Sequence, residues 1–421
     1  MTVTDPRAFL TRLFNAAVAA ADPLEGIRRH LPSRPRGRTI VVGAGKGSAQ
    51  MAAALESCWD GPVEGLVVTR YGFAVPCRHI EIIEASHPVP DDAGLTASMR
   101  LLQLVGDLTA DDLVIALVSG GGSALLPAPA DGLTLADEIV VNRALLASGA
   151  PISAMNTIRK HLSAIKGGRL ALAAYPARVV TFVVSDIPGD NPSLVASGPT
   201  IAGAGNRAEA LELVRLYGLD LPPGVMRHIA SSKADAPAPD DPRFARNDVH
   251  LIASAGVSLE AAAEAARTAG IEAAILSDAI EGEAREAAHV HAAIAREIAL
   301  RDRPFRKPVV LLSGGETTVT VSGKGKGGRN TEFLLSLAVD IDGVAEIDAL
   351  AADTDGIDGS EDNAGAFANG SSVARMRKAG ISPADQLRNN DAWSAFHAID
   401  DLFVPGPTGT NVNDFRAILI R

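Results

Sequence analysis

The chain of 421 residues has two cysteines, Cys58 and Cys77, and aromatic side chains make up only 4% of it. Two cysteines supply neither a disulfide framework nor metal-site spacing, so we expect free thiols in a reducing compartment. No apolar run approaches the ~18 residues that a membrane span needs. Asp5, Arg7 and Arg12 interrupt the N-terminus, where a signal peptide would need an apolar stretch. These absences predict a soluble, cytoplasmic protein.

The sequence also lacks any dense block of Lys or Arg, and its formal net charge is -11 at pH 7. Nucleic-acid binding depends on clustered cations that neutralise phosphates, so we expect no nucleic-acid partner. A small anionic substrate remains compatible with this charge, because a few cations in a cleft outweigh the global charge locally. We therefore expect small-molecule substrates and no membrane partner, and the sequence leaves a homodimer open.

Hydrophobic residues, by contrast, make up 47% of the chain, and 40 glycines mark many tight turns between regular elements. Short apolar strands alternate with helical stretches rich in Ala and Leu. Continuous apolar strands between helices are typical of parallel sheets covered on both faces, which bind ligands at the carboxyl ends of their strands. In the first half, the predicted strands span residues 39–42, 65–69, 80–85, 113–118 and 179–184.

The best candidate for a domain boundary is the proline-rich stretch from Leu219 to Asp248, which has few apolar residues. A second alternating unit follows, with a strand at 249–253 and another at 309–312 that turns at Ser313–Glu316. We predict two α/β domains, residues 1–245 and 246–421, with mostly parallel sheets and an active-site cleft between them.

A glycine-rich turn, Gly43-Ala44-Gly45-Lys46-Gly47-Ser48, follows the first strand and precedes a helix. Such a turn presents free backbone N–H groups and the positive end of the helix dipole to an anion. The dinucleotide fingerprint is incomplete, because Ser48 replaces its last glycine and Thr69-Arg70 end the next strand where an acid is needed. We predict that Gly45 and Lys46 bind phosphate; the structural alternative is a tight turn that packs the helix on the sheet.

A second glycine-rich turn follows the strand at 113–118 and reads Ser119-Gly120-Gly121-Gly122-Ser123. Three consecutive glycines let the backbone adopt positive φ and approach a ligand closely. A purely structural turn rarely needs all three. We predict that these five residues cradle the phosphates of a nucleotide.

A cationic segment runs from Asn156 to Arg169 and contains no acid, which is unusual for a solvated face in an acidic protein. At helical spacing Asn156, Arg159 and Lys160 share a face. We predict that these three residues recognise an anion.

Two acidic loops follow apolar stretches, one with Asp186 and Asp190 and the other with Asp353 and Asp355. Carboxylates are the ligands that Mg²⁺ takes, usually one or two together with phosphate oxygens and water. Asp and Gly also form ordinary turns, so each loop has a structural alternative. We predict Asp190, Asp353 and Asp355 as metal ligands.

Two further glycine-rich segments occur in the second half, Ser313–Glu316 and a cationic stretch from Gly323 to Asn330. Well-patterned α/β sequence flanks the cationic stretch, which favours a binding loop or lid over a disordered linker. Gly314, Glu316 and Asn330 are therefore predicted to contact substrate or ATP.

Together these motifs resemble those of the ATP-dependent glycerate 2-kinases, the class II glycerate kinases with a C-terminal MOFRL domain. The resemblance implies two Rossmann-like α/β domains and transfer of the γ-phosphoryl group of ATP to the 2-hydroxyl of D-glycerate. Some relatives carry the name hydroxypyruvate reductase. The segments that carry the resemblance span nearly the whole chain: 42–48, 86–91, 119–125, 156–168, 185–200, 313–332, 353–366 and 407–414.

Position by position, the resemblance implies that Lys46 and Arg329 are the cations from opposite domains that meet at the transferred phosphate. Phosphoryl transfer needs alignment and neutralisation of spreading charge, which Mg²⁺ and these cations would supply. Asp186 is our candidate for orienting or deprotonating the attacking hydroxyl. Two other functions remain open: an NAD(P)H-dependent hydroxypyruvate reductase, and a non-catalytic sugar-acid or nucleotide-binding protein.

Overall fold

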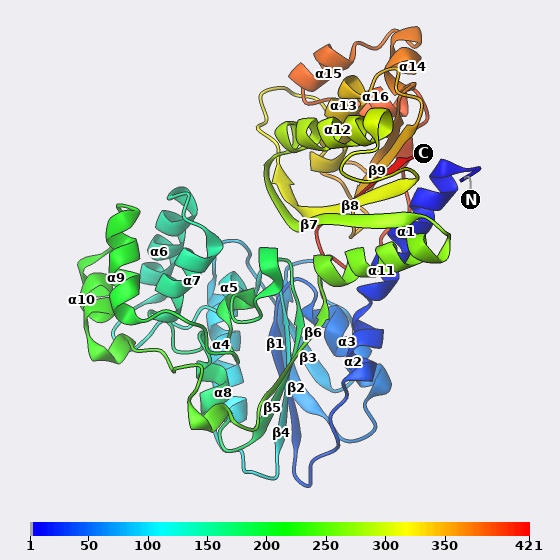
Figure 1. The fold of residues 1–421 in the computed structure, drawn as a ribbon. Helices are drawn as coiled ribbons and strands as arrows, with labels where there is room; N and C mark the ends of the chain where they lie inside the picture. The colour runs from blue at the N-terminus through cyan, green and yellow to red at the C-terminus, as the bar shows by residue number, and fades with distance from the viewer. Residues whose placement is uncertain (1–2) are drawn as a thin grey trace. The chain divides into compact units, whose positions relative to one another are not determined.

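The computed structural model describes residues 3–421, apart from the side chain of Pro188. Its contacts divide the chain into two compact units (Figure 1). The parallel-sheet unit comprises Pro23–Ile252, and the mixed-sheet unit comprises the residues up to Asp22 together with Ala253–Arg421.

The first helix, α1 (Pro6–Ala20), has the predicted apolar face but belongs with the C-terminal part of the chain. Phe14 of α1 contacts Phe403 and Phe415 edge to face, with ring centroids 5.0 and 5.8 Å apart. The predicted boundary lies between residues 245 and 246, whereas the contacts divide the chain after Ile252. A helix whose partners lie so far along the chain carries no local signal of where it packs.

The parallel-sheet unit holds six strands in the order β3-β2-β1-β4-β5-β6. The pairs β2–β3, β1–β2, β1–β4 and β4–β5 are parallel, as predicted. Its strands are β1 (Thr39–Ala44), β2 (Glu64–Arg70), β3 (Ile80–Ala85), β4 (Leu113–Ser119), β5 (Arg178–Val184) and β6 (Asp248–Ala253). Its α-helices are α2 (Pro23–Arg29), α3 (Ser48–Cys58), α4 (Asp92–Val105), α5 (Gly122–Leu125), α6 (Leu135–Ala147), α7 (Ile152–Lys160), α8 (Arg169–Ala173), α9 (Arg207–Leu216) and α10 (Pro223–Ala230).

The strand order reverses between β1 and β4, because β2 and β3 lie on one side of β1 while β4 and β5 lie on the other. In open α/β sheets ligands bind at such a switch point, outside the carboxyl ends of the strands. The two glycine-rich turns that follow β1 and β4 lie there. Strand β6 extends this sheet, so the prediction that it begins the second unit is wrong.

The mixed-sheet unit also has six strands, in the order β11-β10-β9-β12-β8-β7. Only the pair β7–β8 is parallel, and the pairs that join β8, β12, β9, β10 and β11 are antiparallel. Its strands are β7 (Glu272–Glu283), β8 (Val309–Thr318), β9 (Ile347–Asp353), β10 (Gly365–Asn369), β11 (Leu402–Phe403) and β12 (Asp414–Ile420). Besides α1, its helices are α11 (Ala255–Thr268), α12 (Ala284–Arg301), α13 (Arg329–Asp340), α14 (Ser372–Lys378), α15 (Pro383–Arg388) and α16 (Ala392–His397).

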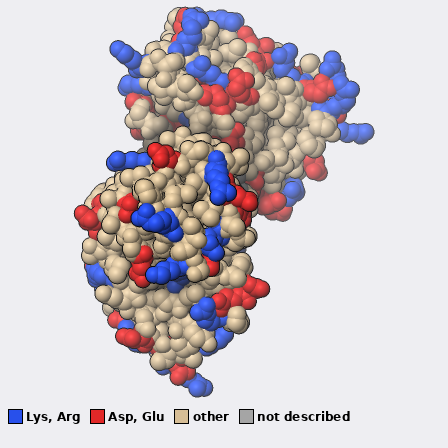
Figure 2. All heavy atoms as spheres, turned by 90° about the vertical axis from the view of Figure 1, so that its left-hand side faces the viewer, with Lys and Arg blue, Asp and Glu red and all other residues tan. Residues whose placement is uncertain are grey.

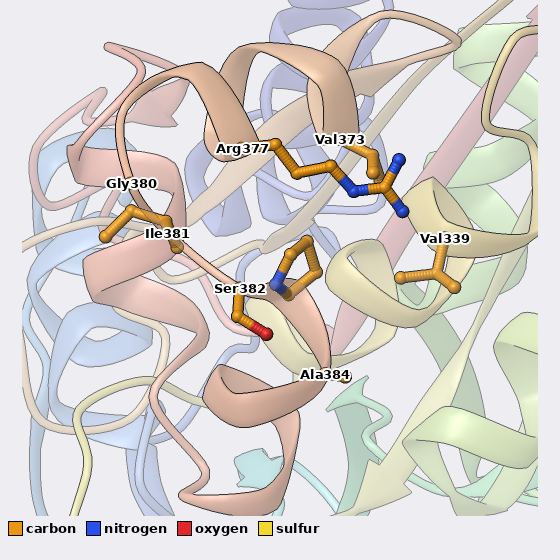
Figure 3. Close-up of a pocket in the computed structure, with 8 residues that line it drawn as sticks. Val339, Val373, Arg377, Gly380, Ile381, Ser382 and Ala384 are labelled. Atoms are coloured by element: carbon orange, nitrogen blue, oxygen red, sulfur yellow. The ribbon is translucent and has the colours of Figure 1, made fainter.

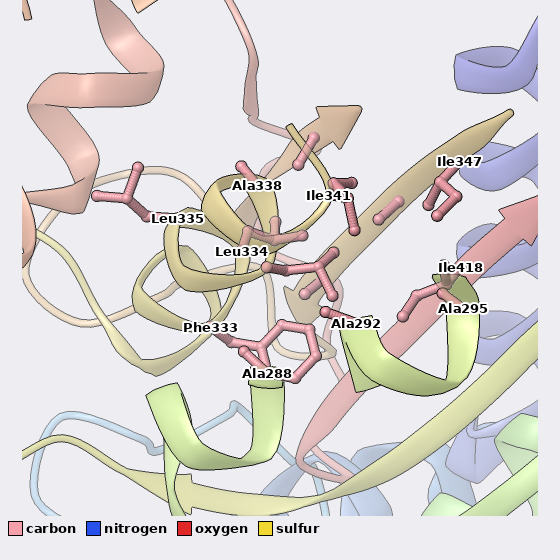
Figure 4. Packing of buried hydrophobic residues seen from close by; sticks show 14 of the residues in the cluster. Ala288, Ala292, Ala295, Phe333, Leu334, Leu335, Ala338, Ile341, Ile347 and Ile418 are labelled. Atoms are coloured by element: carbon pink, nitrogen blue, oxygen red, sulfur yellow. The ribbon is translucent and has the colours of Figure 1, made fainter. Parts of the chain in front are cut away.

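The α/β class is thus confirmed, but the expectation of mostly parallel strands fails for this second sheet. Its strands are apolar on both faces, because α12 and α13 cover one face and α1 and α11 the other (Figure 1). Figure 4 shows Phe333 and Leu334 of α13 packing with Ala292 of α12 against Ile418 of β12. A continuous apolar strand therefore indicates that both of its faces are buried. Strands buried on both faces are usually, but not always, part of a parallel sheet.

Charged side chains of both signs are interspersed over the face shown in Figure 2, which has no continuous basic patch. No helix of the described chain combines the length and the apolar character of a membrane span.

Candidate functional site

The turn after β1 is fastened to the end of β4. A Cβ atom on Gly45 would lie 2.1 Å from the Ser119 hydroxyl oxygen, so glycine is needed here for strand packing. The Ser119 hydroxyl accepts a hydrogen bond from the N–H of Gly47 (3.0 Å), and the N–H of Lys46 donates to the carbonyl of Gly120 (2.8 Å). Ser119 is 2% exposed. The structure therefore gives Gly45 the packing role that was the alternative to phosphate binding, and the Ser119 hydroxyl supports the same packing.

Lys46 lies beside the second glycine-rich turn and has a free charge. A Cβ atom on Gly121, whose φ is +80°, would lie 3.1 Å from Cγ of Lys46 and 3.2 Å from Nε2 of His87. Burial, and then the charges of Lys46 and Arg70, lower the pKa of His87 to about 4, so this imidazole is neutral at pH 7. Within residues 3–421, the Lys46 ammonium makes no hydrogen bond or ion pair. This corner of the parallel-sheet unit is therefore cationic.

Asp186 follows β5 and lies against the same turn. A Cβ atom on Gly120 would fall 1.7 Å from a carboxylate oxygen of Asp186, so only glycine leaves room for that side chain. The structure thus brings Lys46, Asp186 and the Gly120-Gly121 peptide together at the ends of β1, β4 and β5. Gly122, in contrast, packs its backbone against Ala196.

A chain of hydrogen bonds links the second glycine-rich turn to α7. The Ser123 and Ser197 hydroxyls lie 2.5 Å apart, and Ser197 donates to the side-chain oxygen of Asn156 (2.7 Å). Arg159 donates to the side-chain oxygens of Asn156 (3.4 Å) and Asn142 (2.6 Å). Three predicted binding residues, Ser123, Asn156 and Arg159, therefore belong to one connected network.

Lys160 does not join this network. Its ammonium donates to the carbonyls of Gly203 (3.0 Å), Ala204 and Gly205 (2.7 Å), and the residue is 5% exposed. An ammonium has three N–H donors, so all of them are used. The structure contradicts the prediction that Lys160 binds the acid: the side chain secures the loop before α9.

In the mixed-sheet unit, Arg329 begins α13 and is held by three carboxylates. Its guanidinium contacts Glu316 (2.9 Å), Asp353 (2.7 Å) and Asp414 (2.6 Å). Burial alone would lower the pKa of Arg329, but the charges of Asp414, Asp353 and Glu316 outweigh it and raise that pKa. The guanidinium is therefore fully charged, and all three of its nitrogens are fixed in place.

A second layer of polar contacts supports Asp414. The buried Arg416 forms an ion pair with Asp414, and the Asn330 side chain donates to the same carboxylate (2.8 Å). Asn330 is fully buried, and Asp358 accepts hydrogen bonds from the backbone N–H groups of Asn330 (2.9 Å) and Thr331 (2.8 Å) at the start of α13. The structure therefore contradicts direct ATP contact by Asn330 and gives it a positioning role.

Residues 313–316 form part of β8 rather than the predicted turn. Gly314 pairs with Phe415, and a Cβ atom on Gly315 would meet the backbone of Ile280 at 2.3 Å. The two glycines thus let a continuing strand pack between two neighbours, and Gly314 is buried in the sheet. Glu316 is exposed and reaches Arg329, as described above.

The acidic loop after β9 brings Asp353 and Asp355 together, because the N–H of Asp355 donates to the Asp353 carboxylate (3.1 Å). Asp190 lies on a short turn (η1, Pro188–Asp190) in the other unit. No three His, Cys, Asp or Glu side chains of the described residues are arranged to hold a metal ion. A hollow of about 320 Å³ lies beside Arg329 and Asp353, lined also by Val319 and Val321.

Another hollow of about 350 Å³ lies between α13, α14 and α15 (Figure 3). Val339 and Val373 line it, and its Arg377 is paired with Asp342 (3.1 Å). Val339 lies near the end of α13, about 15 Å along the helix from Arg329. This hollow contains none of the predicted site residues.

Comparison with known proteins assigns the family. A model described as a domain of unknown function (DUF4147) matches residues 9–230, and the MOFRL family model matches residues 309–414. D-glycerate 2-kinase of Thermotoga maritima is 39% identical over 96% of both chains. The chain belongs to the glycerate 2-kinase family with a MOFRL domain. A crystal structure of glycerate kinase from Thermotoga maritima is similar, with a TM-score of 0.89 and 37% identity over 99% of this chain and 100% of that one.

The same glycerate kinase family includes a protein of Agrobacterium vitis that bears the provisional name hydroxypyruvate reductase. It is 53% identical over 98% of this chain and 94% of its own length. Names within the family therefore point to two different activities, a kinase and a reductase.

Sequence patterns missed two members of these sites. His87 stands in the Ser86–Asp91 segment, and Asp414 begins the last strand. Both segments carry the family resemblance, which was the available signal. Neither residue has a local pattern that would reveal a contact with Lys46 or Arg329.

Proposed function

We propose that this protein is an ATP-dependent glycerate 2-kinase. It transfers the γ-phosphoryl group of ATP to the 2-hydroxyl of D-glycerate and releases 2-phosphoglycerate and ADP. The observation that carries the proposal is the unpaired Lys46 ammonium beside Gly121, with the Asp186 carboxylate against Gly120. A free cation suits a phosphate, and a nearby carboxylate suits a hydroxyl that must lose its proton.

In this proposal each of the two units supplies one cation to the substrates. Lys46 contacts the transferred phosphate from the parallel-sheet unit, and Arg329 does so from the mixed-sheet unit. Asp186 orients the 2-hydroxyl and accepts its proton as the bond to phosphorus forms. Exclusion of water from the bound substrates protects ATP from hydrolysis.

The acidic loop after β9 fits a magnesium ion by its donor chemistry. Asp353 and Asp355 offer only carboxylate oxygens, and the cluster around Arg329 carries more negative than positive charge. Asp353 and Asp355 would hold the ion, and Asp190 is a further candidate. Such an ion would offset the negative charge of the phosphates. We place the enzyme in the cytoplasm, where its two free thiols stay reduced.

The provisional name of the Agrobacterium vitis relative makes hydroxypyruvate reduction the second candidate. Such an enzyme needs a dinucleotide site, in which an acid at the end of the second strand binds a ribose hydroxyl. In this chain Arg70 stands at the end of β2, and its guanidinium stacks on Phe73 at 3.7 Å from the ring centroid. Gly45 serves strand packing rather than approach to a pyrophosphate. Both features favour the kinase.

A coupled ATP-consumption assay with D-glycerate, hydroxypyruvate and related acids tests the proposal. We expect ATP turnover with D-glycerate and 2-phosphoglycerate as the product. Loss of nicotinamide absorbance with hydroxypyruvate would support the reductase, and binding without either turnover would indicate a sensor.

The Asp186→Asn variant tests the role of the carboxylate. We expect turnover to fall ~10²-fold or more with ATP affinity largely kept, because the hydroxyl then lacks its base. The matched control is Glu212→Gln, which removes an exposed acid on α9 of the same unit. Loss of ATP binding would instead make Asp186 a metal ligand.

A further inference from the structure

We propose that a pocket between α6 and α7 is the subsite for the acceptor acid, and that Glu138 adjusts its charge to favour a monoanionic hydroxy acid. This inference rests on the proposed kinase function and names how the acceptor is recognised. The pocket, termed here the α6–α7 pocket, is lined by Pro90, Ser123, Glu138, Asn142, Arg159 and Lys166. All of these residues belong to the parallel-sheet unit.

Glu138 and Lys166 form an ion pair inside this pocket. The Lys166 ammonium lies 2.5 Å from Oε1 of Glu138, and the Lys166 side chain is 1% exposed. The other carboxylate oxygen, Oε2, is buried and has no hydrogen-bond partner among the described residues. A buried carboxylate oxygen without a donor carries a desolvation cost, so it is suited to accept a hydrogen bond from a ligand hydroxyl.

Arg159 adds a positive charge that no acid balances directly. Its guanidinium donates to the amide oxygens of Asn142 and Asn156, which are neutral. No carboxylate of the described chain lies within ion-pair distance of it. Burial lowers the pKa of Arg159 to about 10, which still leaves the guanidinium charged at pH 7. A buried guanidinium with neutral partners is a site for a carboxylate, which it can bind with two parallel hydrogen bonds.

The charges of the α6–α7 pocket decide which acid fits. Arg159 and Lys166 are positive and Glu138 is negative, so the pocket keeps one positive charge. A single carboxylate matches that charge, whereas a dicarboxylate or a phosphomonoester would bring an unbalanced negative charge into a poorly solvated space. The unpartnered Glu138 oxygen further favours an acid that carries a hydroxyl. Together these features select a small hydroxy acid with one carboxylate.

The position of the pocket suits an acceptor for the reaction at Lys46. The Asn142 side chain donates to the carbonyl of Pro88 (3.2 Å), which follows His87, and His87 borders Gly121. Ser123 of the pocket lies in α5, directly after the glycine turn. The hollow measures about 310 Å³ including its open mouth, but the part that solvent can enter is about 10 Å³, the space of a single water molecule. The carboxylate of the acid therefore binds at the mouth of the pocket, and the rest of the acid faces the turn.

The test uses Glu138→Gln, which keeps the shape of the side chain and removes its charge. We expect the KM for D-glycerate to rise about tenfold, because the hydroxyl loses an ionised acceptor, with kcat changed less than about threefold. Inhibition by tartronate, a hydroxy dicarboxylate, should tighten about tenfold, because the pocket then carries two positive charges. The exposed Glu212→Gln is the control and should leave both constants unchanged.

The double variant Glu138→Gln/Lys166→Met controls for structural damage in the single variant, in which the buried Lys166 loses its partner. It removes both charges of the ion pair, so no unpaired charge remains at these two positions. It restores the single positive charge, so tartronate inhibition should return to the wild-type value while the KM for D-glycerate stays high. Unchanged constants in Glu138→Gln, or tartronate inhibition in the double variant equal to that of the single one, would overturn the proposal.

Calorimetric titration of D-glycerate separates this proposal from the kinase function. Arg159→Gln should weaken binding of the acid by about 100-fold, since it removes the charged fork that holds the carboxylate. If the wild-type protein binds D-glycerate through Arg159 but does not consume ATP, the kinase function fails and the subsite stands. If ATP is consumed with D-glycerate and Arg159→Gln binds it normally, the subsite fails and the kinase function stands.

Discussion

The two units present their key cations in opposite ways. In the parallel-sheet unit, the Lys46 ammonium has no partner among the described residues and stands beside a histidine that is kept neutral. In the mixed-sheet unit, Arg329 is held by three carboxylates, with the buried Arg416 behind Asp414. One cation thus has free charge and a flexible stem, and the other has a fixed position and a charge already balanced.

This contrast follows from the chemistry of the two side chains. Lysine is a compact point charge that can follow a moving phosphate, whereas the planar arginine fork suits a preset geometry. Free charge favours binding of an anion, and fixed donors favour stabilisation of charge that develops during the reaction. We therefore expect Lys46 to matter for both ATP affinity and turnover, and Arg329 chiefly for turnover and for the integrity of its own unit.

The substitution Arg329→Ala should have the largest total effect, because it damages both activity and stability. We expect kcat/KM to fall ~10²-fold or more, about 3 kcal/mol of transition-state stabilisation. Three carboxylates also lose their shared partner, which should lower the free energy of unfolding by about 3 kcal/mol. Coupled-assay kinetics and denaturant unfolding measure the two losses. A variant with wild-type stability would contradict the view that the carboxylates depend on Arg329.

The substitution Lys46→Ala should reduce kcat/KM to a similar extent, ~10²-fold or more, with almost no loss of stability. Its ammonium balances no acid in the folded chain, so its removal leaves nothing buried and unpaired. The thermal midpoint, measured beside that of Arg329→Ala, checks this difference. Equal destabilisation in both variants would contradict the contrast between a free and a fixed cation. Near-normal turnover in both variants would contradict the proposal that Lys46 and Arg329 both contact the transferred phosphate.

Lys160→Met sharpens the same contrast within the parallel-sheet unit. The Lys160 ammonium has no donor left for a ligand, since its three N–H groups bind the carbonyls of residues 203–205. We expect the free energy of unfolding to fall by about 2 kcal/mol, because three carbonyls lose their donor. The KM values for ATP and D-glycerate should stay within about twofold in variants that are folded at the assay temperature. A large rise in the KM for the acid would restore the binding role that the sequence suggested.

The sequence predicted the architecture of the parallel-sheet unit better than that of the mixed-sheet unit. Apolar runs at 39–42 and 113–118 correctly indicated parallel strands, because their helices alternate with them along the chain. The run at 309–312 looked the same but extends to Thr318 and pairs antiparallel with β12. Strand direction depends on partners distant in sequence, and an apolar run records only burial.

For the candidate site, the sequence identified charged residues at the ends of strands but not their partners. Lys46 and Asp186 lie beside the same glycine turn, as their places after β1 and β5 suggested. Lys160 shares a helical face with Arg159, yet its side chain turns to another loop. Glu138 remained unnoticed because only the fold brings α6 to Lys166. The spacing of residues along a helix predicts the side of the helix from which each side chain leaves. It does not predict which atoms the charged end of a long side chain contacts, because that depends on how the side chain bends.

The smallest effect concerns acid stability, where each unit contributes one histidine. Burial and nearby cations lower the pKa of His87 to about 4, and burial lowers that of His291, whose Nε2 lies 2.9 Å from the Ser313 hydroxyl, to about 4. The unfolded chain takes up protons near pH 6.5, so stability is full above that value and falls as the pH drops toward 4. His291→Gln should remove about 1 kcal/mol of this loss at pH 5.5, measured by denaturant unfolding. His87→Gln should flatten the same slope less with ATP bound than without it, because a phosphate beside Lys46 offsets the nearby cations but not the effect of burial on the pKa of His87. An identical slope with and without ATP in the wild-type protein would show that no phosphate binds there.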